Sequence, residues 1–353
     1  IPDSVTSIGE DAFCDCTSLT NIVIPDSVTS IRDYAFFGCT GLTSVTIPEG
    51  VKAINSDAFY GCNLLTQVTL PSSLTYLADS AFSNSYNLSR YYLNGAYYLG
   101  NENNPVIALI GIDNDNFTEI EDGCKFICSQ AFSYGSISGM NLVIPDSVIS
   151  ISGRAFSSSD VASVIIPGSV TYIGEDAFCN CDHLTDIVFS DGLTSIDYVI
   201  AYDCDSLTTI VLPNTIQNMV NLVGGCPNIA YNIYGNGKYL GSEENPYLAL
   251  FGSVSENEDL IIKDGCRIIC SAMGSRYFRG KSIIIPTSVE IICASAFYYY
   301  YFNSVTTQVY YAGSQEQWNS VDVDYNNNIV LGDYYSGTFR LFVKMMSETR
   351  PVD

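Results

Sequence analysis

The chain has 353 residues, and 38 acidic residues against 14 Lys and Arg give it a formal net charge of −24. This charge argues against nucleic acid or an anionic membrane surface as a partner, because both require a basic protein surface. No run of about 18 apolar residues occurs, so we expect no insertion into a membrane. Length alone favours two domains, but internal repeats organise nearly the whole chain.

A repeat of 23 residues begins at the first residue. Residues 1–8, Ile-Pro-Asp-Ser-Val-Thr-Ser-Ile, return with the same start at residues 24–31, and later copies begin with Ile-Pro or Leu-Pro. An Ala-Phe pair follows at a fixed place in most copies. These pairs are 12–13, 35–36, 58–59, 81–82, 131–132, 155–156, 177–178 and 296–297. Because so short a unit cannot close a core alone, the copies are predicted to stack and share one.

Each repeat also carries the pattern Leu-Thr-x-Ile-x-Ile, which predicts a short strand with alternate side chains turned inward. The Pro that follows lacks a backbone donor and ends the strand. The Ala-Phe-x-x-Cys stretch is then the return turn, with Phe in the interior. No long stretch shows an apolar period of 3.6 residues, so we expect no long helix.

A second period of 141 or 142 residues overlies the first. Residues 98–100, Tyr-Leu-Gly, match residues 239–241, and Asp-Gly-Cys at 122–124 matches residues 264–266. Two repeats are therefore enlarged, by inserts near 94–120 and 235–262. Each insert has a Tyr-rich run, an Asn-rich turn and an apolar run, which together predict a β-hairpin.

These motifs resemble the BspA-like (Treponema pallidum-type) leucine-rich repeat family over residues 1–311. The resemblance implies a β-rich α/β solenoid: a right-handed, curved leucine-rich-repeat array of 23-residue units with two β-hairpin inserts. Residues 312–353 resemble the family's C-terminal capping segment. The family implies a secreted or cell-surface protein, and several members are associated with adhesion. Because the chain starts in mid-repeat, we expect the N-terminal cap and any signal peptide to lie upstream.

Most of the 13 cysteines fall on interior positions of the repeat, so we expect buried free thiols. Cys124 and Cys266 share the position of Val5. Cys270 and Cys293 align on consecutive repeats, so a disulfide between them remains an open alternative. One interior turn position is shared by Cys16, Cys39, Cys62, Cys181, Cys204 and Cys226.

We expect no enzyme, no metal site and no cofactor. His183 is the only His and occupies a variable turn position, so no nucleophile–His arrangement is supported. The Cys-x-Cys pairs at 14–16 and 179–181 do not supply four well-placed zinc ligands. The oxygen-rich segments 113–116 and 256–259 lack the glycine of an EF-hand loop, so we expect plain acidic hairpin tips.

The most specific expectation concerns the strand face. The residue between the last two apolar positions of each strand is predicted to point outward on the concave surface, and polar residues are expected two positions earlier. A contiguous exposed apolar stripe with a polar border is typical of partner surfaces. The candidate partner-binding residues are Tyr92, Val143, Ile165, Val188, Val211, Ile233 and Ile284.

The leading hypothesis is a non-catalytic extracellular interaction protein. It would bind a protein or glycan, on a host or microbial surface, through the concave strand face and two protruding hairpins. Tyrosines of the inserts, such as Tyr98 and Tyr239, either join this recognition surface or pack in the core. The alternative hypothesis is a structural spacer or stalk that displays another domain.

Overall fold

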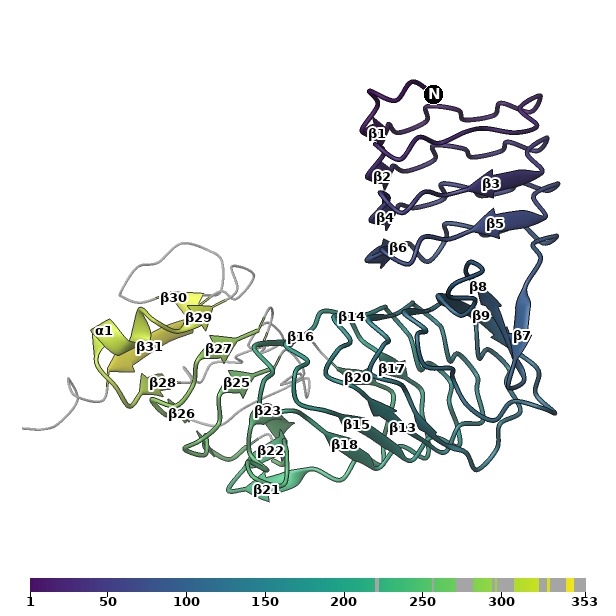
Figure 1. The fold of residues 1–353 in the computed structure, drawn as a ribbon. Helices are drawn as coiled ribbons and strands as arrows, with labels where there is room; N and C mark the ends of the chain where they lie inside the picture. Colours follow the sequence, from purple (N-terminus) through teal and green to yellow (C-terminus); the bar gives the residue numbers. More distant parts are fainter. Residues whose placement is uncertain are drawn as a thin grey trace, which may run out of the picture. The chain divides into compact units, whose positions relative to one another are not determined.

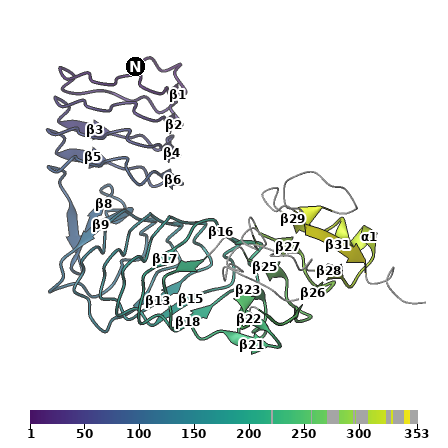
Figure 2. The same cartoon turned by 180° about the vertical axis from the view of Figure 1, so that it is seen from behind.

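The computed structural model describes residues 1–219, 222–255, 257–270, 282–293, 296, 308–323, 329–330 and 341–345. The contacts within the chain divide it into two units. The N-terminal unit comprises residues 1–184 and 200–206, and the C-terminal unit comprises residues 185–199 and 207–353. Figures 1 and 2 show that both are built from stacked turns of chain with short strands.

Each ordinary repeat forms one rung of a β-solenoid and carries two short strands, where the sequence predicts one. The predicted strand lies in one ladder, column A, and the Val-Thr-Ser-Ile segment forms a second ladder, column B. In the N-terminal unit, column A contains β3 (Ser44–Thr46), β5 (Gln67–Thr69), β11 (Asn141–Val143) and β13 (Ser163–Ile166). Column B contains β1 (Ser7–Ile8), β2 (Ser30–Ile31), β4 (Ala53–Ile54), β6 (Tyr76–Leu77), β10 (Phe126–Ile127), β12 (Ser150–Ile151) and β14 (Tyr172–Ile173).

The C-terminal unit repeats both columns. Column A contains β15 (Asp186–Phe189), β18 (Thr209–Val211), β24 (Leu260–Ile261), β26 (Ser282–Ile285), β28 (Gln308–Tyr311) and β31 (Leu341–Met345). Column B contains β16 (Ser195–Ile196), β19 (Asn218–Met219), β25 (Ile268–Ile269), β27 (Ile291–Ile292) and β29 (Asp322–Val323). The remaining short elements are β17 (Ala201–Tyr202), β20 (Val223–Gly224), β30 (Ile329–Val330) and α1 (Gln315–Trp318).

Neighbouring rungs pair in parallel and in register, which places identical repeat positions side by side. Ser30 pairs with Ala53, for example, 23 residues further on. The Phe of each Ala-Phe pair stacks on its equivalent, and the centroids of Phe36 and Phe59 lie 5.0 Å apart. The Phe59 N–H donates to the carbonyl of Ala81 in the next rung. The shared core predicted from the repeat is therefore confirmed.

The shared cysteine position has a polar role as well as a packing role. Four of its members, Cys39, Cys62, Cys181 and Cys204, are buried, as predicted. Each thiol donates to the carbonyl of a Phe one rung earlier, at 2.9 to 3.3 Å. Ser85 occupies the same position and donates to the Phe59 carbonyl at 2.8 Å.

Two members of this cysteine set do not meet the expectation of burial. Cys16 is exposed and Cys226 is only partly buried. The residues that the structure describes include no rung before that of Cys16, so none of them offers it a Phe carbonyl. The prediction of burial was therefore wrong for Cys16 and Cys226.

The return turns hold several residues in a left-handed backbone conformation. The residue before several Ala-Phe pairs has a positive φ, as at Asp11 (56°), Asp57 (54°) and Asp176 (57°). The second residue after the Phe also adopts this conformation, as at Asp15 (55°) and Asn180 (55°). Asp and Asn tolerate left-handed backbone better than most residues, so the turns select for them.

The two enlarged repeats form the hairpins that the sequence predicts, but the hairpins are part of the ladders. In the N-terminal unit, β7 (Tyr91–Leu93), β8 (Ala96–Leu99) and β9 (Ala108–Ile112) pair antiparallel, and β9 then pairs in parallel with β10. In the C-terminal unit, β21 (Asn232–Tyr234), β22 (Gly237–Leu240) and β23 (Ala249–Ser253) repeat the arrangement, and β23 pairs with β25.

The expectation that the hairpins protrude was therefore wrong. Tyr98, Leu99 and Leu109 are buried, because β9 continues column B and its neighbours pack into the core. The tight turn at Asn94 and Gly95 has φ values of 49° and 75°. A side chain at Gly95 would meet the Asn116 backbone at 2.2 Å, so Gly is required there.

A long basic side chain connects the rungs on either side of each hairpin. Lys125 Nζ donates to the carbonyls of Ser72 (2.6 Å) and Leu74 (3.3 Å). Arg267, at the equivalent position, donates from Nη1 to the carbonyl of Asn214 at 2.7 Å. Both contacts span about one enlarged repeat, so the same device recurs in both units.

Candidate functional site

The outward side chains of column A form the surface that the sequence singles out, here named the strand stripe. In the N-terminal unit, Val143 on β11 and Ile165 on β13 are direct register partners. Their side chains are 61% and 39% exposed. Thr46 and Thr69 hold the same position on β3 and β5. This unit therefore presents an aliphatic section and a threonine section on equivalent strands.

The strand alternation that exposes these residues is as predicted. Between them, Leu142 and Val164 point inward and are buried. The predicted polar border is also present, because Ser163 Oγ donates to Asn141 Oδ1 across the two strands at 2.7 Å. Val143 and Ile165 thus form an apolar pair beside a hydrogen-bonded polar pair.

The C-terminal unit has two sections of stripe. Val188 on β15 pairs with Val211 on β18, and both are partly buried. Ile284 on β26 pairs with Ile261 on β24 and with Tyr310 on β28. Ile261 is 52% exposed and Ile284 is partly buried. Five of the seven predicted residues therefore occupy column A positions.

The expected position was wrong for Tyr92 and Ile233. Tyr92 lies on β7 and pairs with Tyr97, while Ile233 lies on β21 and pairs with Lys238. Both belong to the antiparallel hairpins, and Val211 bridges to Gly241 instead of to Ile233. Each is 50% exposed, so both lie on the hairpin face rather than in the stripe.

Ile261, like Tyr310 on the other side of Ile284, is a stripe residue that sequence reasoning missed. It precedes the Asp-Gly-Cys segment at 264–266 by a few residues and stands where Glu119 stands in the first enlarged repeat. The long period already aligned that segment, so the return strand of each enlarged repeat could have been found from it. The strand before the insert was chosen instead, because residues 226–229, Cys-Pro-Asn-Ile, match the Cys-x-x-Leu segment of the ordinary repeat.

The first hairpin face is polar and aromatic. Tyr92 Oη donates to Asp113 Oδ2 at 2.9 Å, and this bond raises the pKa of the tyrosine. Hydrogen bonds from Asn116 and Tyr92 lower the pKa of Asp113. The Asp115 N–H also donates to Asp113 Oδ1 at 3.2 Å. These oxygens are thus engaged by the loop's own donors.

The second hairpin face is cationic and aromatic. Lys263 Nζ lies 4.5 Å from the ring centroid of Tyr234, and Lys238 Nζ lies 5.9 Å from that of Tyr231. Tyr234 is 40% exposed. Cation–π pairs of this kind orient an exposed ring. The first hairpin also carries one such pair, with Arg90 Cζ 6.0 Å from the ring centroid of Tyr97, so the two hairpins differ mainly in the Tyr92–Asp113 bond.

The buried insert tyrosines belong to the core, which decides one alternative left open by the sequence. Tyr98 and Tyr239 are fully buried, and burial raises the pKa of each phenol. Tyr98 Oη accepts from the Glu121 N–H, and Tyr239 Oη accepts from the Lys263 N–H, both at 3.0 Å. The sequence also holds four consecutive Tyr at residues 298–301, which lie outside the described residues.

The buried thiols are poorly suited to nucleophilic chemistry. Burial raises the pKa of Cys39 to about 11 and those of Cys62 and Cys124 to about 12, so few thiolates exist at neutral pH. Cys270 and Cys293 are buried free thiols, and burial with a hydrogen bond to Cys293 raises the pKa of Cys270.

Metal-binding and membrane-spanning features were also searched in the described segments. These segments contain no group of three or more His, Cys, Asp or Glu side chains that could hold a metal ion. His183 is an exposed turn residue, as expected, with Nδ1 3.5 Å from Asp160 Oδ1. None of the helices in the described residues is long and apolar enough to cross a membrane.

Comparison with known proteins gives a family match. Residues 1–102 and 113–223 match the model of the BspA type leucine-rich repeat region, in six copies. A search of curated proteins found no match.

Several solved structures are similar at low TM-score. A leucine-rich cell surface protein from Faecalibacterium prausnitzii is 26% identical, with 92% of this chain and 81% of that chain covered and a TM-score of 0.30. A leucine-rich repeat protein from Bacteroides ovatus is 21% identical, with 98% and 82% covered and a TM-score of 0.35. The leucine-rich repeat protein of T. pallidum is 22% identical, with 60% and 78% covered and a TM-score of 0.27.

Proposed function

The chain belongs to the BspA-type leucine-rich repeat family, and from this premise we propose that it is a non-catalytic extracellular interaction protein whose strand stripe binds a protein partner. We place it on the cell surface or among secreted proteins, in keeping with the family. The aliphatic pair Val143 and Ile165 is the observation that carries the proposal.

These two exposed side chains are aliphatic, although the fold also accepts polar residues at the same position of column A. Thr46 and Thr69 hold the same position on ordinary rungs of the same unit, so the fold does not require aliphatic side chains there. Exposed aliphatic surface costs solvation free energy that burial against a partner would recover. The bordering Asn141 and Ser163 supply hydrogen-bonding groups for the rim of such an interface.

Catalysis does not fit the same surface. The described cysteines with shifted pKa values all have them raised, which disfavours a thiolate nucleophile. His183, the only His, forms its ion pair with Asp160 and not with a Ser or Cys nucleophile. A binding role, which needs only complementary surface, is the simplest use of the stripe.

A paired substitution tests this role. The wild-type protein would be screened by surface plasmon resonance against purified extracellular matrix and mucosal proteins. The double variant Val143→Asp, Ile165→Asp should lose at least about tenfold in affinity for the bound protein, because each change places a charge in an apolar contact. The double variant Thr46→Asp, Thr69→Asp is the matched control and should bind like wild type.

Other results would contradict the proposal. If the aliphatic variant binds as tightly as wild type, the stripe is not the contact surface. If wild type binds none of the proteins while cells still display it, the spacer alternative gains instead.

A further inference from the structure

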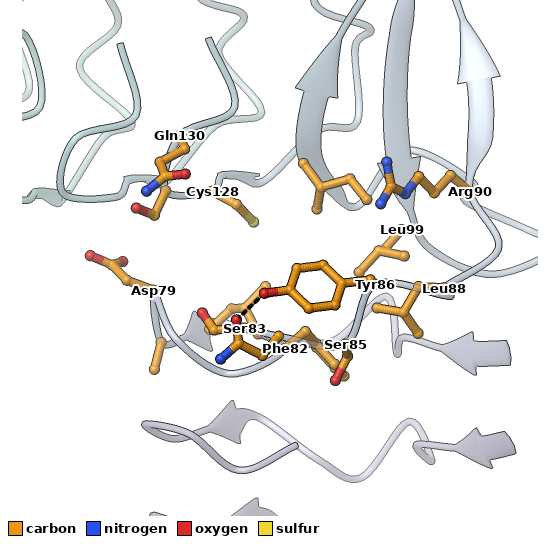
Figure 3. A pocket seen from close by; sticks show the side chains of 15 residues that line it. Asp79, Phe82, Ser83, Ser85, Tyr86, Leu88, Arg90, Leu99, Cys128 and Gln130 are labelled. Carbon is orange, nitrogen blue, oxygen red and sulfur yellow. Dashed lines mark hydrogen bonds between the residues drawn. The ribbon is translucent and has the colours of Figure 1, made fainter. Parts of the chain in front are cut away.

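A cavity of about 490 Å³ lies in the N-terminal unit beside the first enlarged repeat. Its walls come from the fourth rung, from Leu99 and Ile110 of the hairpin, and from residues 128–130 of the following rung. Figure 3 shows the ring of Tyr86 between Cys128 and Gln130 on one side and Phe82 on the other. This volume falls in the range of small-molecule sites.

The cavity lies where the phenylalanine stack is interrupted. Phe13, Phe36, Phe59 and Phe82 stack with centroid spacings of 5.0 to 5.2 Å. The next Phe of the repeat, Phe132, packs instead against Phe117, at 5.2 Å and nearly perpendicular. Phe82 therefore ends the first stack among the described residues, and it lines the cavity. One face of the Phe82 ring therefore borders the cavity in place of a further stacked Phe.

Tyr86 supplies a second ring, and hydrogen bonds fix it although it is 73% exposed. Its Oη donates to Asn84 Oδ1, the bond drawn as a dashed line in Figure 3. Asn84 Nδ2 in turn donates to Tyr60 Oη. An exposed tyrosine held in this way loses little further freedom when a ligand packs on it. The ring is thus preorganised at the cavity.

The cavity rim carries hydrogen-bonding groups of both charge signs. Asp79, Arg90 and Gln130 line it with exposed side chains. They offer carboxylate and amide acceptors together with guanidinium and amide donors, which suit hydroxyl groups. Asp79 Oδ2 also accepts a hydrogen bond from the Gly153 N–H at 2.8 Å. This bond connects the fourth rung to the rung that contains β12.

From these features we propose that this cavity binds a neutral saccharide. Sugar rings have apolar C–H faces that pack on aromatic rings and hydroxyl edges that both donate and accept hydrogen bonds. The chain's charge of −24 and Asp79 at the rim disfavour an anionic sugar. An apolar peptide side chain would leave the polar rim unpaired on binding.

Two residues of the site differ in the second enlarged repeat. In the alignment of the two long units, Tyr86 corresponds to Pro227 and Arg90 to Tyr231. We expect one saccharide per chain. The inference goes beyond the proposed protein-binding role and uses different residues, so the two can fail separately.

Saturation-transfer-difference NMR on the full chain tests the site. The neutral probes are lactose, cellobiose, mannobiose and N,N′-diacetylchitobiose, with sialyllactose as the anionic probe and acetyl-Phe-Leu-amide as the peptide probe. At least one neutral disaccharide should bind, and Tyr86→Ala and Gln130→Ala should each weaken it by about tenfold. Tyr202→Ala, at another exposed tyrosine of the same unit, should leave binding unchanged.

Three outcomes would overturn the inference. The first is no wild-type signal with any neutral disaccharide, the second is a signal that Tyr86→Ala leaves intact, and the third is a Tyr86-dependent signal with the peptide alone. The double variant Val143→Asp, Ile165→Asp should keep saccharide binding, which separates this site from the strand stripe.

Discussion

Ordinary rungs and enlarged repeats solve the same packing problem in different ways. An ordinary rung stacks identical side chains, Phe on Phe, with a cysteine thiol on a phenylalanine carbonyl. An enlarged repeat cannot stack in this way, because its hairpin occupies the ladder. It uses a buried tyrosine and a long basic side chain, Tyr98 and Lys125 in the N-terminal unit. Stacked copies of the same side chain therefore stabilise the ordinary rungs, whereas individual polar contacts stabilise the enlarged repeats.

The largest expected effect comes from breaking the phenylalanine stack. Phe59 lies between Phe36 and Phe82, so Phe59→Ala should lower the free energy of unfolding by about 3–5 kcal/mol. Phe13→Ala is the control, because Phe13 stacks on one side only and is partly buried. Urea unfolding followed by circular dichroism measures both. Equal losses would show that stacking on both faces contributes nothing.

The connecting lysine comes next. Lys125→Met keeps the length of the side chain but leaves the carbonyls of Ser72 and Leu74 without this donor, and should cost about 2 kcal/mol. Lys52→Met is the matched control, since Lys52 holds the same repeat position on an ordinary rung and is exposed. Thermal unfolding compares the two. A cost at Lys52 as large as that at Lys125 would contradict the connecting role.

Alkaline pH should weaken the ordinary rungs through their thiols. Burial raises the pKa of Cys62 from 9.0 to about 12 and that of Cys39 to about 11, so the folded state keeps protons that the unfolded state loses. Stability is full below pH 9.0 and falls as pH rises above it, by at most roughly 1.4 kcal/mol per pH unit for each thiol.

Urea titrations between neutral and alkaline pH measure this decline. The double variant Cys39→Ser, Cys62→Ser should show a shallower decline than wild type, because two of the raised thiols are gone. An unchanged slope would mean that these thiols do not link folding to pH.

The smallest effect on stability is expected for replacing a cysteine by serine, because one rung already has serine at that position. Ser85 fills the cysteine position and makes the same bond to a phenylalanine carbonyl. Cys62→Ser should therefore change the unfolding free energy by less than about 1 kcal/mol, whereas Cys62→Val, which has no donor, should cost more. A serine variant less stable than the valine variant would show that apolar packing, not the bond, selects cysteine here.

The same difference between ordinary rungs and enlarged repeats explains which features could be predicted from the sequence. In ordinary rungs each side chain packs against the equivalent residue of the next rung. The shared core, the buried cysteines and the outward Val143 and Ile165 can therefore be predicted from the repeat alone. The second strand of each rung was missed because two residues, such as Ser30 and Ile31, are too few to show alternation.

The enlarged repeats were harder to predict. Their hairpins follow from local turn signals, but whether β9 protrudes or pairs with β10 depends on a tertiary contact that those signals do not contain. For this reason Tyr92 and Ile233 were assigned to the stripe and Ile261 was overlooked. The cavity at Tyr86 likewise arises only where a stack ends, which no single repeat reveals.

Photo-crosslinking tests most directly the claim that ordinary rungs, not hairpins, contact the partner. Benzoylphenylalanine would replace Ile165 in one variant and Tyr92 in another, each incubated with the protein found in the binding screen. We predict a crosslinked product from position 165 and little from position 92. A product from position 92 alone would place the contact on the hairpin face and contradict the strand-stripe account.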